Sequence, residues 1–312
     1  MLDKLSTDGF EKKKNAVRED RPYHFLHELE PNTNGQMRKV NTLFLTGKEC
    51  VFHCLMCDLW KNTLDSPTPI GALVEQIDYA LAQLPEAEAI KLYNSSNFFD
   101  VTAVPLADYP AIATRLQKYE RVIVENHPRL CGQHCIDFDK LFPGKLEVAM
   151  GLESIHPEVM SKLNKQMSLE DFEKATKFLR QHDIDVRAFV LLNPPYLTDR
   201  EENIYWAIKA VEFAFACGVN FCTLIPTRTG NGIMEELEKQ GLYQAPELST
   251  LEDTLEACLS LNKGFVFADT WDLEKFTTCS ACLEPRRARI EQMNLSQTVL
   301  PKITCNCQSE SD

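Results

Sequence analysis

A chain of 312 residues with 44% hydrophobic content is long enough to bury one large core. Its net charge of -13 disfavours tight unaided binding to a nucleic-acid backbone, which depends on clustered Lys and Arg, although a local basic patch is compatible with it. No stretch approaches the roughly 18 consecutive apolar residues of a membrane span, and the first residues lack the apolar core of a signal peptide. We therefore expect a cytoplasmic protein without a membrane segment, whose 12 cysteines ligate metal or clusters rather than form disulfides.

Short apolar runs alternate with amphipathic patterns, which is typical of repeated βα units and a parallel sheet. Residues 1–38 precede them, and we interpret this charged, weakly periodic stretch as an N-terminal extension. The runs that predict strands are residues 42–46, 89–93, 121–125, 146–151, 186–192 and 219–225. Six parallel strands are sufficient for an open barrel. A further apolar run at 265–267, followed by polar residues 269–272, predicts a closing strand or a lid.

Two apolar stripes with helical spacing predict core-facing helices between these runs. Their residues are Leu73, Ile77, Leu81 and Leu84 in the first stripe and Ile204, Ile208, Val211 and Phe215 in the second. Motifs that resemble capping boxes predict helix starts at Ser168, Thr198 and Thr250. The sequence thus predicts an α/β fold, with a partial barrel over residues 39–276 and a small cysteine-bearing tail at 277–312.

Cys50, Cys54 and Cys57 form a C-x3-C-x2-C triplet in the loop after the first predicted strand. Three thiolates at this spacing can hold one iron–sulfur cluster, and because a cubane has four irons, one iron stays free to bind another molecule. The alternative is a zinc knuckle in which His53 supplies the fourth ligand. Zinc sites usually consist of paired short spacings, so the triplet favours the cluster.

The triplet, together with residues 21–57, 90–100, 151–154 and 190–198, resembles the radical S-adenosylmethionine (SAM) superfamily. Within it, the chain is similar to the branch of the Elongator catalytic subunit and the methylthiotransferases, and its layout is most similar to the radical SAM subunits of archaeosine synthases. The resemblance implies a partial (β/α)6 barrel, a 4Fe-4S cluster whose open iron binds SAM, and reductive cleavage of SAM to a 5′-deoxyadenosyl radical. It also implies an electron donor of the flavodoxin or ferredoxin type.

The resemblance assigns part of a SAM site to two loops. Met56 occupies the position that contacts adenine, where the family usually has an aromatic residue. Asn94, Ser95 and Ser96 stand where the family has a Gly-Gly-Glu-like turn that binds the SAM amino group, but the acidic member of that turn is missing. An ordinary polar turn after a strand is the alternative.

Strand residues complete the candidate SAM site. Glu153 and Ser154 close the fourth predicted strand, at the end where barrel enzymes do their chemistry, and could bind the ribose or methionyl group of SAM. Arg187, within the fifth predicted strand, is suited to pair with a carboxylate inside the barrel, or is a surface arginine if it points outward. Glu125 ends the third predicted strand and is a candidate for orienting SAM or substrate.

Other polar and cysteine positions carry weaker patterns. Cys131 and Cys135, with His127 and His134 nearby, fit no standard metal spacing, and we favour a packed loop or a substrate-contacting thiol. Arg228, in the loop after the sixth predicted strand, could reach a phosphate or carboxylate, or belong to a plain connection. The remaining cysteines of the barrel lie in apolar patterns and are interpreted as buried core residues: Cys217, Cys222 and Cys258.

Two short cysteine pairs lie in the tail, Cys279 with Cys282 and Cys305 with Cys307. This layout resembles a four-cysteine zinc site, in which a structural zinc would hold a tail too short to have its own core. An auxiliary iron–sulfur cluster also accepts four thiolates. Reduced thiols without a metal are the third alternative.

The leading hypothesis is a radical SAM enzyme that abstracts hydrogen from a substrate such as a modified tRNA nucleoside, bound with help from a partner subunit. The same machinery acting on a small metabolite is the alternative that the acidic charge favours. A hypothesis from a different class is a non-enzymatic electron-transfer or metal-binding protein, which would have neither SAM binding nor a barrel.

Overall fold

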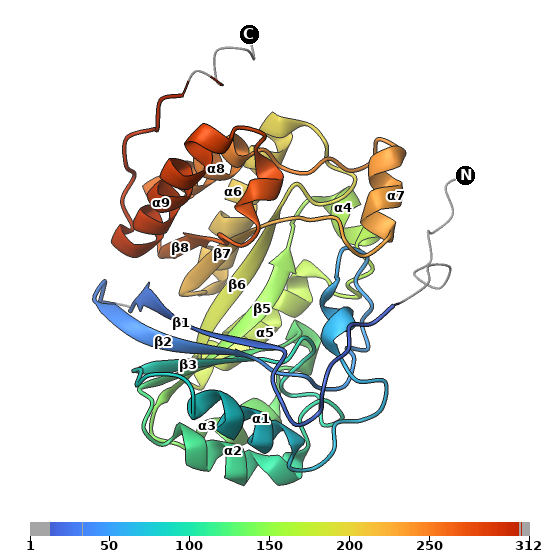
Figure 1. Cartoon of the computed structure of the whole chain (residues 1–312), viewed down its shortest axis with the longest axis vertical. Helices are drawn as coiled ribbons and strands as arrows, with labels where there is room; N and C mark the ends of the chain where they lie inside the picture. Colours follow the sequence, from blue (N-terminus) through green and yellow to red (C-terminus); the bar gives the residue numbers. More distant parts are fainter. Residues whose placement is uncertain (1–12, 33, 306, 308–312) are drawn as a thin grey trace.

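Eight strands form one curved sheet in a computed structural model that describes residues 13–32, 34–305 and 307. Neighbouring strands follow chain order; the first pair is antiparallel and the others are parallel. The strands are β1 (His24–Pro31), β2 (Met37–Phe44), β3 (Ala89–Tyr93), β4 (Arg121–Glu125), β5 (Lys145–Glu153), β6 (Asp185–Leu192), β7 (Phe221–Pro226) and β8 (Phe265–Ala268). The carboxyl ends of the parallel strands therefore lie along one rim of the sheet (Figure 1).

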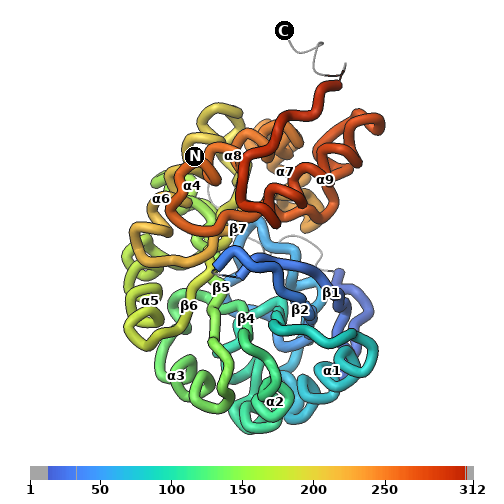
Figure 2. Tube along the Cα trace, turned by 90° about the vertical axis from the view of Figure 1, so that its left-hand side faces the viewer, coloured from blue at the N-terminus to red at the C-terminus, as the bar shows by residue number. Residues whose placement is uncertain are grey.

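Helices cover the outer face of the curved sheet. Figure 2 shows α1, α2, α3, α5 and α6 around the outside of the strands. The helices are α1 (Ala72–Leu81), α2 (Tyr109–Leu116), α3 (Gln133–Asp139), α4 (Pro157–Lys162), α5 (Leu169–Gln181), α6 (Arg200–Cys217), α7 (Ile233–Lys239), α8 (Leu248–Ser260) and α9 (Ser280–Ser296), with 3-10 turns η2 (Leu59–Asn62), η3 (Leu106–Asp108), η4 (Pro128–Leu130) and η5 (Leu273–Phe276). In the described part of the chain, no helix is long and apolar enough to cross a membrane.

Side chains alternate between the two faces of each strand, and this alternation divides the core. On β3, Ile90 and Leu92 are fully buried in the large apolar cluster that the strands form with the helices. Ala89, on the opposite face of the same strand, belongs to a smaller cluster with Val40 and Ala149. The inner face of the curled sheet is therefore a separate layer, which also holds charged residues.

Buried ion pairs link the strands inside the barrel. Arg187 donates to Glu147 on β5 (Nε to Oε1, 2.7 Å) and to Glu30 on β1 (Nη2 to Oε2, 3.0 Å). Arg121 on β4 donates to the other carboxylate oxygen of Glu147 at 2.9 Å, and Lys91 on β3 pairs with Glu30. All these side chains are buried, so little water screens their attraction. The network joins β1, β3, β4, β5 and β6.

The predicted α/β fold and open barrel are confirmed. The predicted runs correspond to β2 through β7, and the run at 265–267 lies in β8. β2 begins earlier than predicted, at Met37, because its first residues pair with β1. β1 itself lies in the stretch that we interpreted as an extension, of which residues 1–12 are outside the described part of the chain.

One of the predicted helix starts is confirmed. Ser168 caps α5 in a complete capping box, with its side chain accepting the amide of the third helical residue at 3.1 Å. The start at Thr198 is wrong by one residue, because the side chain of Asp199 caps α6. The start at Thr250 is also wrong: α8 already begins at Leu248, and Thr250 is buried within its first turn.

Helix α9 covers the edge of the sheet at β8. Val266 and Ala268 direct their backbone groups away from β7, toward the side where β8 ends the strand order. Asn294 accepts from the amide of Ala268 and donates to its carbonyl, both at 2.8 Å. Gln297 makes the same pair of bonds to Val266, at 2.8 and 2.9 Å. Two side-chain amides thus satisfy the backbone groups that another strand would satisfy.

Glu147→Leu should lower the free energy of unfolding by about 3 to 5 kcal/mol, because it leaves Arg121 and Arg187 without this buried counter-charge. Urea unfolding followed by circular dichroism measures the change. Glu173→Ala removes an exposed partner of Lys177 at 2.6 Å, and this control should cost less than about 1 kcal/mol. Equal losses for the two variants would contradict the importance of the interior network.

Candidate cluster and cofactor site

The cysteine triplet lies in the loop between β2 and η2, at the rim where the parallel strands end. Cys50, Cys54 and Cys57 are free thiols and are half-buried. They face one cavity, which is also lined by Glu49, His53, Leu55, Trp60, Ser95, Asn231 and Ile233. The loop therefore directs its thiols into a space shared with residues that follow β3 and β7.

Neighbouring segments fix the conformation of the cysteine loop. Leu55 donates its amide to the carbonyl of Leu163, just after α4, at 2.9 Å. Phe52 stacks on His127, with ring centroids 3.6 Å apart and planes 13° from parallel. Because the loop is already ordered, less conformational entropy is lost when its thiols bind a ligand.

Asn231 holds the other end of the cysteine loop. Its Nδ2 donates to the carbonyls of Leu55 at 2.8 Å and Cys57 at 3.2 Å. Its Oδ1 accepts from the amide of Met234 at 2.9 Å, in the first turn of α7. Trp60 Nε1 also donates to the Cys57 carbonyl, at 3.0 Å. One asparagine thus links the thiol-bearing loop to the start of a helix.

Burial and nearby polar groups shift the pKa values of the three thiols in opposite directions. Burial raises the pKa of all three thiols, that of Cys54 to about 11, and so opposes the thiolate form. The positive charge of Lys165 has the opposite effect and lowers the pKa of Cys54. Asn97 Nδ2 donates to Cys50 Sγ at 3.1 Å. Because iron binds thiolates, a bound cluster would offset the effect of burial.

The turn after β3 lies beside the thiols and carries unpaired polar atoms. Ser95 Oγ is 2.9 Å from the hydroxyl oxygen of Tyr23. Among the described residues, the side-chain amide of Asn94 and the hydroxyl of Ser96 are buried without a hydrogen-bond partner. Burying such atoms unpaired costs free energy, so the turn is suited to a polar ligand.

Glu125 adds an acidic group beside this turn. It ends β4, the neighbour of β3, and its Oε1 is buried without a hydrogen-bond partner in the described part of the chain. Burial raises the pKa of its carboxyl group to about 7, against the opposing effect of the amides of residues 94–96. The sequence identified Glu125 as a candidate, but its place next to the turn depends on the adjacency of the two strands.

Glu153 and Ser154 lie where β5 ends on the same rim. Glu153 has a φ of 65° and accepts from Lys165 Nζ at 2.7 Å. A Cβ at Gly151 would lie 2.0 Å from Glu153 Oε1, so glycine leaves the space that this ion pair occupies. Ser154 Oγ accepts from the amide of His156 at 3.1 Å. Lys165 was missed because a lysine in a loop carries no sequence signal of burial.

The remaining predicted residues are engaged within the protein. Met56 is half-buried and packs against the apolar clusters around α7 and the end of β6. The alternative that Arg187 points outward is wrong, because its guanidinium is buried and pairs with Glu30 and Glu147. Arg228 donates to Asp269 at 2.6 Å, so its loop is held internally.

Cys131 and Cys135 are packed within the protein. Cys131 Sγ lies 3.5 Å from Met150 Sδ, and Cys135 is fully buried. Burial lowers the pKa of nearby His127 to about 3. Cys217, Cys222 and Cys258 are buried, as predicted. Within the described part of the chain, one set of metal-ligating groups has its donor atoms within 4.8 Å of one another: Cys279, Cys282, Cys305 and Cys307.

Sequence comparison finds archaeal relatives. No protein-family model matches the chain. An uncharacterised protein of Methanocaldococcus jannaschii is 23% identical over 294 residues, which are 86% of this chain and 80% of that protein. The archaeosine synthase subunit beta of Methanosarcina acetivorans is 25% identical over 240 residues, which are 71% of this chain and 67% of that protein.

Structural comparison decides the fold. The solved structure of Elp3 from the archaeon Methanocaldococcus infernus superposes with a TM-score of 0.53 and 16% identity, over 72% of this chain and 59% of that chain. This chain has the radical SAM fold. The predicted resemblance is therefore confirmed at the level of the fold.

The rim fits the groups that a radical SAM fold holds. Its three thiols would leave a cubane cluster with one iron free of protein ligands. Polar atoms of Asn94, Ser96 and Glu125, which have no partner in the described part of the chain, are suited to a polar ligand beside them. The rim thus offers thiols that suit an iron–sulfur cluster and polar side chains that suit SAM.

Asn231→Ala should lower the free energy of unfolding by about 1 to 3 kcal/mol, because the cysteine loop loses the donor to two of its carbonyls. Thermal or urea unfolding measures the loss. Gln83→Ala removes an exposed side-chain hydrogen bond to the Tyr79 carbonyl and should have little effect. If the two substitutions cost the same, Asn231 does not hold the loop.

Proposed function

We propose that this protein is a radical SAM enzyme that binds a 4Fe-4S cluster through Cys50, Cys54 and Cys57 and binds SAM at the same rim. The supporting observation is that three free thiols lie beside polar side chains without partners among the described residues, at the mouth of a barrel of this fold. When bound, the cluster supplies the electron that breaks the sulfonium bond of SAM, and the resulting radical abstracts a hydrogen atom from the substrate.

Residues on two neighbouring segments, the turn after β3 and the end of β4, bind the amino end of SAM. The side chains of Asn94 and Ser96 provide hydrogen-bonding groups that have no partner among the described residues. Glu125 replaces the acidic residue that the turn lacks, and its carboxylate accepts from the amino group. Ser95 is held by Tyr23 and keeps the turn in place. This division of roles follows from the position of Glu125 at the end of the next strand.

Other rim residues bind the rest of SAM. Met56 lies against adenine through its polarizable thioether, after moving from its present apolar contacts. Glu153 and Ser154 bind the ribose or methionyl group. Arg187 is left out of the SAM site, because its withdrawal would leave Glu30 and Glu147 without a buried counter-charge.

The substrate that we favour is a modified tRNA nucleoside, presented with the help of a partner subunit. Support comes from the relative named archaeosine synthase subunit beta, whose name indicates a multi-subunit enzyme. The net charge of -13 is consistent with a partner that provides most of the RNA contacts. A small metabolite remains the alternative substrate for the same site. The electron would come from a flavodoxin or ferredoxin.

A non-enzymatic electron-transfer protein is disfavoured by the fold. Such a protein needs a cluster and an exposed path for the electron, but not a barrel. Here the thiols open into a cavity that Ser95 also lines, and the neighbouring Asn94 and Ser96 carry buried polar atoms without a partner among the described residues. These groups are useful only if a second molecule binds beside the cluster.

Anaerobically reconstituted protein should contain a 4Fe-4S cluster and should form 5′-deoxyadenosine when dithionite and SAM are added. Iron analysis, electron paramagnetic resonance and chromatography of the nucleoside measure both properties. Cys54→Ala should lose the cluster and the product. Cys217→Ala removes a buried cysteine outside the site and should retain both. Zinc instead of iron in the wild type, or no product above the Cys54→Ala background, would refute the proposal.

Glu125→Gln should weaken SAM binding mainly above pH 7. With a carboxyl pKa of about 7, Glu125 is largely ionised at pH 8 and largely protonated at pH 6. A carboxylate is the stronger acceptor, so the ratio of variant to wild-type Kd should be about tenfold at pH 8 and should approach one at pH 6.

Equilibrium binding of SAM to cluster-loaded protein measures these constants. Because SAM titrates in the same way in both measurements, its own protonation cancels in the ratio at each pH. Glu120→Gln changes an exposed carboxylate just before β4 and should give a ratio near one throughout. A ratio for Glu125→Gln that does not change with pH would show that its carboxylate has no contact with SAM.

A further inference from the structure

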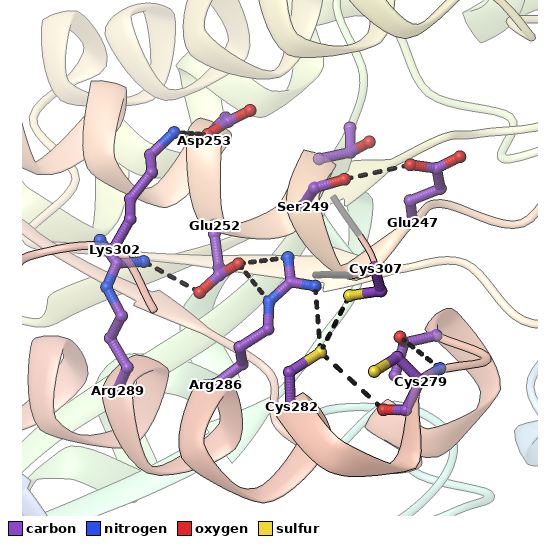
Figure 3. A network of polar contacts seen from close by, with 12 residues as sticks. Glu247, Ser249, Glu252, Asp253, Cys279, Cys282, Arg286, Arg289, Lys302 and Cys307 are labelled. Atoms are coloured by element: carbon purple, nitrogen blue, oxygen red, sulfur yellow. Dashed lines mark hydrogen bonds and ion pairs between the residues drawn. The ribbon is translucent and has the colours of Figure 1, made fainter. Parts of the chain in front are cut away.

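Four cysteines from separate parts of the C-terminal region meet at the start of α9. Cys279 immediately precedes the helix, Cys282 lies in its first turn, and Cys305 and Cys307 belong to the chain that returns to it. Their Sγ atoms all lie within 4.8 Å of one another. The separations from Cys279 to Cys305 and from Cys282 to Cys307 are both 3.7 Å. Figure 3 shows Cys282 directed toward Cys307.

These separations match the ligands of one tetrahedral ion. Zinc–thiolate bonds of about 2.3 Å at tetrahedral angles put neighbouring sulfurs about 3.8 Å apart. A disulfide would need about 2 Å between sulfurs. An iron–sulfur cluster distributes four thiolates over several irons, which spreads the whole set more widely than a single ion does.

We propose that Cys279, Cys282, Cys305 and Cys307 bind one structural zinc ion, distinct from the cluster at the rim. Four protein ligands leave no open position for water or substrate, which is the arrangement of structural zinc sites. Among the alternatives of zinc, auxiliary cluster and free thiols, the size of this site favours zinc.

The surroundings of the site complement its charge. Four thiolates around a divalent ion carry a net charge of about minus two, and nearby donors stabilise it. Arg286 is buried and approaches Cys282 Sγ with Nη1 at 4.0 Å. Its Nε donates to Glu252 on α8 at 2.7 Å, and Arg289 donates to the other oxygen of Glu252 at 2.9 Å (Figure 3). Glu252 thus fixes the guanidinium that faces the sulfur.

The zinc would tie the returning chain to α9. Arg289 already donates to the carbonyls of Leu300 at 2.5 Å and Pro301 at 2.8 Å, at the middle of this return. The metal adds a second attachment where the return ends. Since Asn294 and Gln297 fasten the other end of α9 to β8, zinc would hold the helix that covers the sheet edge.

Metal analysis of the full chain tests the proposal. Cys50→Ala/Cys54→Ala/Cys57→Ala removes the rim thiols, and this triple variant, purified without added metal, should contain about one zinc per chain. Adding Cys282→Ser should abolish the zinc. Adding Cys217→Ala instead, a matched loss of a buried thiol, should leave it. Iron in place of zinc in the triple variant, or no metal, would overturn the assignment.

Cobalt substitution decides the matter even if the ligand variants do not fold. The triple variant loaded with Co²⁺ should show the strong visible absorption of a tetrahedral tetrathiolate site, and about one equivalent of Zn²⁺ should remove it. The weak absorption of six-coordinate cobalt would overturn the proposal.

Stability and iron content test the structural role. Removing zinc from the triple variant with a chelator should lower its Tm, and returning zinc should restore it. In the otherwise wild-type chain, Cys282→Ser should leave the iron content of the rim cluster unchanged. An unchanged Tm, or iron lost together with Cys282, would contradict a separate structural zinc.

Discussion

The fold depends on neutralising the charges that the curled sheet encloses. Each strand places alternate side chains inward, and inside the barrel Lys91, Arg121 and Arg187 meet carboxylates from other strands. A buried ion pair adds little net stability compared with apolar residues, but a missing partner is costly. The antiparallel strand β1 contributes Glu30 to this network, where it pairs with both Lys91 and Arg187.

The rim differs from this interior because some of its buried polar atoms have no hydrogen-bond partner among the described residues. Asn94, Ser96 and Glu125 have buried polar atoms without partners in the described chain, although they lie next to a loop whose own carbonyls are well satisfied. A rigid loop with available donors and acceptors beside it is a prepared site, because little reorganisation is needed when a ligand arrives. Interior pairing and rim availability together support the proposed placement of the chemistry at the carboxyl ends of the strands.

Local patterns in the sequence were sufficient to predict those elements whose structure depends mainly on their own residues. Apolar runs predicted β2 through β7, and short cysteine spacings identified both sets of thiols. β1 was not predicted, because its mixture of polar and charged residues, including the buried Glu30, looks like that of a surface segment. The approach of Glu125 to the turn after β3, and of Lys165 to Glu153, depends on packing between distant segments. Thr250 was wrongly predicted to start a helix, because a sequence that resembles a capping box also occurs inside α8, which begins at Leu248.

Two amide side chains, Asn294 in α9 and Gln297 directly after it, also limit how this protein can assemble with others. Asn294 and Gln297 occupy the outward hydrogen-bonding groups of β8, so a strand from another molecule cannot add to the sheet there. The same occupation removes an exposed edge of the kind that promotes aggregation. A partner subunit that approaches this side must therefore recognise the side chains on the surface of α9 rather than the backbone beneath it.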